Sequence, residues 1–169
     1  MPITDFLLPE YDKEMANTRR MLASIPDDRL DFKPHAKSFS MKDLAIHLAT
    51  IPEWGAETVE KSEFDFAPEG KPSYQPPDLK SQKQLLETFD RGVAKARAAI
   101  AGANDDALLQ PWSLLQTGKV LFTMPRIAVL RSFVMNHAIH HRAQLGVYLR
   151  LVDQPVPGMY GPTADEAAF

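Results

Sequence analysis

Hydrophobic side chains recur at steps of three and four residues in four stretches of the chain, which is the spacing of one face of an α-helix. In the longest stretch, residues 123–152, these positions are Ile127, Leu130, Val134, His137, His141, Leu145, Tyr148 and Val152. Thr123 is the expected N-cap, and Pro125 falls in the first turn, where its missing N–H costs little. Two prolines, Pro155 and Pro157, follow the pattern. We therefore predict one long helix over 123–151.

The same spacing predicts three earlier helices. The first covers residues 5–25, and its apolar face carries Leu8, Tyr11, Met15, Thr18, Leu22 and Ile25. The second follows Ser40, a good N-cap, and continues to residue 60, with Pro52 expected to bend or divide it. The third begins near Asp78 or Ser81 and ends near Gly102.

Between the helices lie connections without a helical period. Residues 61–78 contain four prolines and are long enough to run the length of the helices, so consecutive helices need not be antiparallel. Residues 103–122 leave room for one helical turn at the sequence DDALL. The segment after residue 154 is expected to cover one end of the fold as coil.

No stretch alternates convincingly between apolar and polar residues as a half-buried strand does. Four helices with single apolar faces therefore predict an all-α fold, a four-helix bundle with long crossover connections. A length of 169 residues suits one well-filled core, so we expect a single domain over residues 1–169.

Histidines on the apolar faces are the chemically informative residues. His137 and His141 are four residues apart, so they share one helix face at the spacing that lets two imidazoles bind one metal ion. His47 lies on the apolar face of the second predicted helix, and a bundle would bring it toward the same axis. The alternative for His137 and His141 is a neutral core histidine bonded to a carbonyl or carboxylate, and the spacing of this pair alone leaves the two interpretations about even.

Two further histidines serve as comparisons. His140 lies about 60° around the helix from His137, so we expect it at the edge of the apolar face, as a surface group or a support for a ligand. His35 follows Pro34 in a connection and is expected to face solvent.

Composition narrows the function classes. A formal net charge of −3 gives no basic surface for nucleic acid, and no uninterrupted apolar run approaches a membrane span. The N-terminal residues carry no signal-peptide pattern, so a cytoplasmic protein is the simplest expectation. Without cysteine, a metal site in this chain must use nitrogen and oxygen ligands.

The chain contains the segments HLATIPEW around His47, MPR at 124–126, NHAIHHRAQLGVYLR at 136–150 and PVPGMYGPTADE in the tail. Together these four segments resemble the DinB/YfiT-like superfamily of metal-binding four-helix bundles. The resemblance implies that His47, His137 and His141 are the metal ligands and that the protein is a homodimer. It also implies thiol-dependent chemistry with bacillithiol, mycothiol or glutathione, as in better-characterised relatives.

Three neutral imidazoles around Zn²⁺ or Ni²⁺ leave a coordination position free, as in catalytic metal sites. An HExxH site would place a glutamate between the histidines, but here Ala138, Ile139 and His140 intervene, so the general base is unidentified. The other candidate site residues are Glu53, His140, Arg142, Gln144 and Tyr160.

Each of these candidates has an expected role. Glu53 could contribute a carboxylate from the second helix. Arg142 could bind an anionic substrate or pair with a carboxylate, and Gln144 could orient a ligand or a bound water. Tyr160 could reach over the site or pack as a simple lid.

Two classes of function follow from the sequence. The first is a metal-dependent enzyme acting on a small molecule, with a thiol-dependent transferase preferred to a hydrolase. The second is a non-catalytic interaction module in which a metal joins two helices. The open coordination position and Trp54 near His47 favour the enzyme, and the missing base favours the module.

Overall fold

The computed structural model describes residues 1–166, and most of them are helical. Its long helical segments are α1 (Thr4–Leu22), α2 (Met41–Glu60), α3 (Gln82–Gly102) and a continuous run made of α5 (Arg126–Val129), the π-helix η3 (Leu130–Asn136) and α6 (His137–Leu151). Short helices are η1 (Asp27–Arg29), η2 (Pro68–Gly70) and α4 (Asp105–Leu109). The four predicted long helices and the turn at DDALL are thus present.

The helix starts follow the capping residues. Ser40 accepts a hydrogen bond from the Asp43 backbone N–H, and the Asp43 carboxylate accepts one from the Ser40 N–H. This capping box confirms the predicted start of α2. The Ser81 side chain caps α3 by accepting from the N–H of Gln84, so the helix begins at the second of the two predicted starts, Asp78 or Ser81. Pro52 lies inside a continuous α2, so it does not divide that helix.

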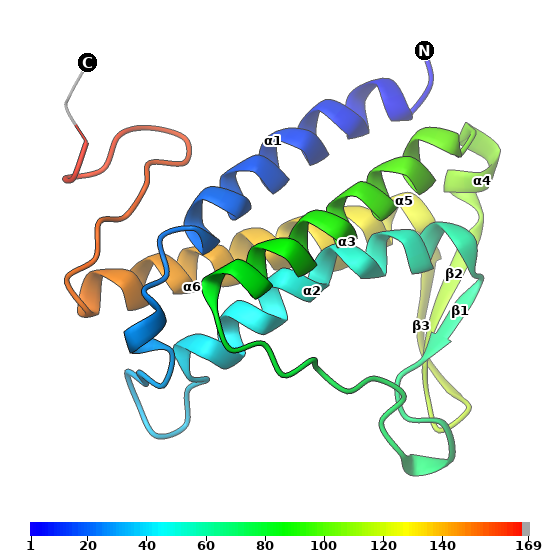
Figure 1. Ribbon diagram of the computed structural model, residues 1–169. Coiled ribbons are helices and arrows are strands. Elements are labelled where there is room, and N and C mark those ends of the chain that lie inside the picture. The colour runs from blue at the N-terminus through cyan, green and yellow to red at the C-terminus, as the bar shows by residue number, and fades with distance from the viewer. Residues whose placement is uncertain (167–169) are drawn as a thin grey trace.

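A small sheet lies at one end of the helices (Figure 1). Strand β1 (Glu63–Asp65) pairs in parallel with β2 (Pro111–Gln116), which pairs antiparallel with β3 (Lys119–Pro125). The prediction of an all-α chain is therefore wrong in this part: the fold is helix-dominated with a three-stranded sheet. Because 103–122 was expected to be a connection without strands, the hairpin β2–β3 is the main element that the sequence prediction missed.

The tight turn of the hairpin explains how the sheet forms. Thr117 and Gly118 join β2 and β3 with positive φ angles of 54° and 73°. Asp65 at the end of β1 accepts hydrogen bonds from the backbone N–H groups of Ala67, Thr117 and Gly118 at 2.7–3.1 Å. One carboxylate thus ties the parallel strand to the hairpin turn.

The start of the last helical run also differs from the prediction. Thr123 and Met124 belong to β3, where they face Ser113 and Trp112, so Thr123 is not the N-cap. The helical run begins at Arg126, with Pro125 in the N-cap position. The hydrogen bonds of the β2–β3 ladder, which a helical periodicity does not reveal, hold these residues extended.

The connection between α2 and α3 returns along the molecule, so these two helices run in the same direction (Figure 1). This confirms that consecutive helices need not be antiparallel. Helix α3 packs on α1 and α2, and α6 packs on the same two helices. Their inward side chains form one core, which includes Tyr11, Leu48, Phe89, Val134 and Leu145.

The tail from residue 155 to 166 lies over one end of the helices, as predicted (Figure 1). Arg150 of α6 binds Asp165, and Arg20 of α1 donates to the Gly158 carbonyl. Gly158 has no room for a side chain, because an added Cβ would collide with the Glu166 carboxylate and the Gly161 carbonyl.

Within residues 1–166, we find no helix with the combined length and apolar character that a bilayer span requires.

Candidate metal centre

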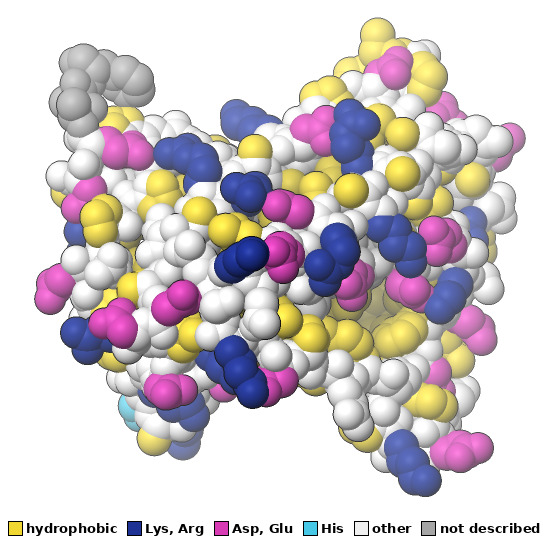
Figure 2. All heavy atoms as spheres, in the orientation of Figure 1, with side chains coloured by type: hydrophobic (Ala, Val, Ile, Leu, Met, Phe, Trp, Pro, Cys, Tyr) yellow, Lys and Arg dark blue, Asp and Glu magenta, His cyan; other side chains and the backbone are white. Residues whose placement is uncertain are grey.

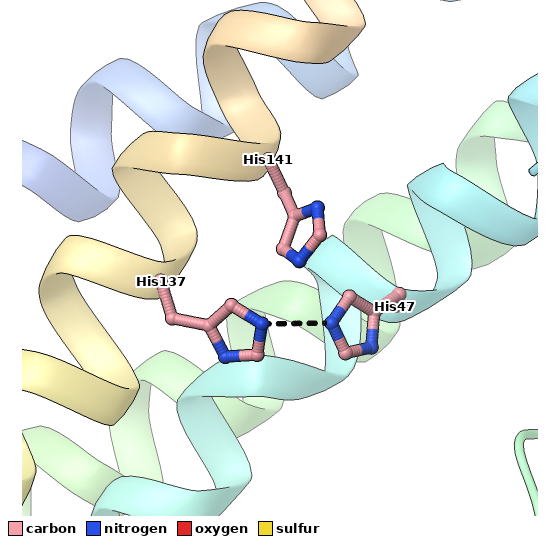
Figure 3. A group of neighbouring side chains, drawn as sticks. All are labelled: His47, His137 and His141. Atoms are coloured by element: carbon pink, nitrogen blue, oxygen red, sulfur yellow. Dashed lines mark hydrogen bonds between the residues drawn. The ribbon is translucent and has the colours of Figure 1, made fainter. Parts of the chain in front are cut away.

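Three histidines converge between α2 and α6. His47 comes from α2, and His137 and His141 come from successive turns of α6; their rings point toward one another (Figure 3). The His47 and His137 Nε2 atoms are 3.2 Å apart, and one ring nitrogen of each of the three residues lies within 4.8 Å of the others. The structure therefore brings together the three side chains that the sequence singled out.

The opposite ring nitrogens of two of these histidines have hydrogen-bond partners. His137 Nδ1 lies 3.3 Å from the Phe133 carbonyl oxygen, and His141 Nδ1 lies 2.7 Å from the Gln144 side-chain oxygen. Both partners accept, so each Nδ1 carries the proton and each Nε2 keeps a lone pair directed at the cluster. Gln144 therefore orients His141, which is one of the roles expected for it.

The surroundings keep the cluster neutral. Burial, with smaller contributions from His141 and His137, lowers the pKa of His47 to about 4. Burial likewise lowers the pKa values of His137 and His141. Neutral imidazole is the form that binds a metal ion, so the site is preset for coordination at neutral pH.

The π-helix η3 directly precedes His137 and contributes to the site. A π turn widens the helix by one residue and is frequent at functional sites. Its residue Phe133 supplies the carbonyl that orients His137. This π turn could not be predicted from the apolar positions, because Leu130, Val134 and His137 are still four and three residues apart across it.

Arg126 aligns the two helices that carry the histidines. At the start of α5 its guanidinium donates to the carbonyl oxygens of Thr58 and Lys61, at the C-terminal end of α2, and of Ala107 in α4, all at 3.0–3.1 Å. A cation at a helix C-terminus satisfies carbonyls that have no partner within the helix. Sequence reasoning noted Arg126 only as part of the MPR segment and missed this function.

Arg142 lies in a buried network away from the histidine rings. Its guanidinium donates to the Glu14 carboxylate and to the Tyr160 hydroxyl, both at 2.7 Å, and Tyr160 in turn donates to Glu14 at 2.7 Å. Of the two expected arrangements for Arg142, pairing with a carboxylate is the one present. The network joins α1, α6 and the tail, and it is where the structure places Tyr160.

The two remaining candidates contact the site less closely. His140 is exposed, with its ring centroid 4.9 Å from that of His141. Glu53 faces α3, where an added Cβ on Gly92 would lie 3.2 Å from its Cγ. His35 is exposed, as predicted, and is separate from the cluster.

Aromatic side chains connect the cluster to a cavity of about 370 Å³. The Trp54 ring lies 6.1 Å from the ring of His47 and 5.7 Å from that of His137, and Trp54 also lines the cavity. Phe133, whose carbonyl orients His137, lines the cavity as well. A small molecule bound in the cavity would therefore contact Trp54 and Phe133, which in turn lie against the histidines.

The donor set fits a divalent transition metal. Within residues 1–166 the grouped ligand atoms are imidazole nitrogens alone, which suit Zn²⁺, Ni²⁺ and related ions. His47 Nε2 lies within hydrogen-bond distance of His137 Nε2, and a cation bound by the three rings would take the place of that contact.

Comparison with known proteins agrees with these features. The family model described as "DinB family" matches residues 4–168. The uncharacterized protein YrdA of Bacillus subtilis (strain 168) is 27% identical over 169 residues, covering 97% of this chain and 92% of that protein.

Two solved structures share the fold. A DinB-like protein from Bacillus cereus ATCC 10987 superposes with a TM-score of 0.68 at 23% identity, over 94% of this chain and 98% of that one. The DinB-like protein YjoA of Bacillus subtilis gives a TM-score of 0.69 at 19% identity, over 90% and 96% of the two chains. With the family model matching nearly its whole length, the chain belongs to the DinB family.

Proposed function

We propose that this protein is a metal-dependent enzyme that uses His47, His137 and His141 to hold a divalent transition metal, with Zn²⁺ or Ni²⁺ preferred. The observation that carries the proposal is the convergence of three neutral imidazoles from two helices beside an apolar cavity. A bound ion with three protein ligands would supply a Lewis acid that lowers the pKa of a coordinated thiol or water.

The reaction we prefer is transfer of a low-molecular-weight thiol to a small electrophile. The thiol sulfur forms a bond to the electrophilic carbon, the leaving group departs with its bonding electrons, and the thiol proton passes to solvent. Trp54 and Phe133 would hold the electrophile and exclude water beside the histidines. This reaction needs less help from a general base than hydrolysis does, because a thiol ionises far more readily than water.

Two alternative functions use the same three histidines. A hydrolase would use the same open position, but the grouped ligand atoms in residues 1–166 include no carboxylate to act as base. A non-catalytic module would use the metal to join α2 to α6. Thermal unfolding with and without a chelator separates an enzyme from a non-catalytic module. Removing a structural metal lowers the midpoint strongly, because that metal contributes to folding, whereas removing a catalytic metal leaves the protein largely folded.

The experiment for the transferase is a conjugation assay. Protein loaded with Zn²⁺ or Ni²⁺ is mixed with bacillithiol, mycothiol or glutathione and 1-chloro-2,4-dinitrobenzene, and release of chloride is followed. We expect turnover with at least one thiol, and its loss in His141→Ala but not in His35→Ala. A metal-loaded protein that accelerates none of the three reactions contradicts the transferase.

We also propose, from the family resemblance, that the long helices form a DinB/YfiT-like four-helix bundle with a crossover, that the chain is a cytoplasmic homodimer and that its substrate is a small molecule. Light scattering coupled to size exclusion tests the dimer, and fractionation of cells tests the location.

A further inference from the structure

The cavity beside the histidines is lined mainly by aromatic side chains from separate parts of the chain. Trp54 comes from α2, Phe64 from β1, Trp112 from β2, Phe122 from β3 and Phe133 from η3. The Phe122 and Phe133 rings stack at 4.8 Å with an angle of 16° between their planes, and Trp112 lies 6.3 Å from Phe122. These rings make a wall from the sheet to the residue that orients His137.

A volume of about 370 Å³ is within the range of cavities that bind small molecules, and flat aromatic walls favour a flat ring. The hairpin β2–β3 supplies much of this wall. The small sheet therefore forms part of the proposed binding cavity.

Of the polar atoms in the cavity wall, the Tyr74 hydroxyl, the Trp112 indole nitrogen and Glu57 Oε2 have no hydrogen-bond partner within residues 1–166, although Glu57 Oε2 lies against the Lys61 ammonium. Trp112 is 6% exposed, and its indole N–H donates to no acceptor in the part of the chain that the structure describes. A buried N–H without an acceptor is costly, and a ligand that brings an acceptor removes that cost. Trp112 on β2 and Tyr74 in the connection before α3 are thus the two wall residues whose donors have no acceptor.

The charge around the cavity selects a neutral acceptor over an anion. Glu57 is a lining residue, and its carboxylate is paired with Lys61. An anionic ligand would have to approach this carboxylate in an apolar setting, where repulsion is poorly screened. A carbonyl oxygen would accept from Trp112 without that cost.

An adjoining cavity of about 420 Å³ shares Trp54, Glu57, Phe64 and Tyr74 with the first one. It is also lined by Lys61, Arg91 and Lys95. Figure 2 shows a hollow with hydrophobic side chains on its floor and charged side chains around it, between the helices and the connection over residues 61–81. This second cavity offers a path from solvent to the aromatic one.

We propose that the aromatic cavity binds a flat ring bearing a neutral carbonyl group, with the carbonyl oxygen accepting from the Trp112 indole N–H. The assignment of this ligand as the substrate of the metal centre rests on the function proposed above. The binding of the ligand is independent of that function, because none of the three histidines forms the cavity wall.

The test uses two ligands of the same shape, 2-acetylnaphthalene and 2-isopropenylnaphthalene, which differ in having a carbonyl oxygen or a methylene group. The chain has two tryptophans, so its ¹H–¹⁵N spectrum has two indole N–H signals, which Trp54→Phe assigns by removing one of them. We expect the ketone to bind at least about fivefold more tightly and to move the Trp112 signal downfield, because it alone supplies a hydrogen bond. We expect Trp112→Phe to bind the two ligands equally.

The same titration in His137→Ala separates this proposal from the metal-dependent function. If His137→Ala still binds the ketone while the metal-loaded wild type has no conjugation activity, ligand binding in the cavity is supported and the transferase function is contradicted. If the ketone fails to bind wild-type protein, or binds without moving the Trp112 signal or without preference over the hydrocarbon, the proposal is overturned. The wild-type comparison decides this even if Trp112→Phe does not fold.

Discussion

At the scale of single residues, the candidate site depends on hydrogen bonds that direct lone pairs. His137 and His141 each place a proton on Nδ1, toward the Phe133 carbonyl and Gln144, so both Nε2 atoms are unprotonated, which is the form that binds a cation. The three histidines could be recognised in the sequence because they share helix faces. Gln144 was also among the candidates, whereas the partner of His137 could not be found, because the backbone carbonyl of Phe133 carries no residue signature.

Arg142 and Glu14 form a charge pair that is 2% and 7% exposed, and its loss should be expensive. Glu14→Gln leaves the buried guanidinium without its counter-charge, so we expect the free energy of unfolding to fall by about 3 to 5 kcal/mol. Urea unfolding at neutral pH measures this change.

The matched control is Asp90→Asn, which weakens the pair between Arg19 and Asp90, both about half exposed. Exposed pairs contribute less than about 1 kcal/mol, so this variant should unfold almost as the wild type does. If both variants lose the same amount of stability, the buried pair of Arg142 and Glu14 contributes no more than an exposed pair does.

At the scale of helices and strands, close contact between α2 and α3 depends on small residues. An added Cβ on Gly55 would lie 3.0 Å from the Ala96 Cβ, which is attached to backbone and cannot move alone. On Gly92 it would lie 3.4 Å from the backbone nitrogen of Glu53. These contacts position α2, and with it His47, against the rest of the core.

Two glycine-to-alanine variants test that packing. Alanine is favoured over glycine inside a helix by about 0.5 to 1 kcal/mol. At Gly146 of α6 the nearest atom to an added Cβ is the flexible Met21 Cε at 3.5 Å, so Gly146→Ala should raise the thermal midpoint. Gly55→Ala should lower it, because overpacking costs about 1 to 3 kcal/mol. A higher midpoint for both would show that the contact between α2 and α3 is loose.

The helices could be predicted from the sequence better than the strands could. Ser40 with Asp43, and Ser81, are strong helix starts, and both were found. The hairpin was missed because Val120 and Leu121 read as a short apolar run, and because Thr117 is an unusual residue at positive φ in a two-residue turn. Two strand-like runs separated by Thr117 and Gly118 were the available signal.

At the scale of the whole molecule, the neutral histidine cluster links folding to pH. His47 has a pKa of about 4 in the folded protein, below its ordinary value of about 6.5. Between these values the unfolded chain binds more protons than the folded one. The stability that the neutral His47 contributes is therefore fully present above pH 6.5 and is lost as the pH falls toward 4.

We therefore expect metal-free protein to become less stable from pH 6.5 to pH 4.5, as measured by urea unfolding. The same series on His47→Asn removes this titration while it leaves the carboxylates unchanged. The difference between the two curves should shrink or reverse as the pH falls. A constant difference across this range would mean that His47 is not held neutral by the fold.

The most direct test of the central claim is the metal content of untagged protein after incubation with Zn²⁺ or Ni²⁺ and removal of excess ion, measured by elemental mass spectrometry. We expect about one equivalent per chain in wild type and in His35→Ala, because His35 is exposed and distant from the cluster. His141→Ala should retain far less while keeping the wild-type circular dichroism spectrum. Equal metal content in His141→Ala and His35→Ala, or no uptake by folded wild type, would contradict a metal centre at His47, His137 and His141.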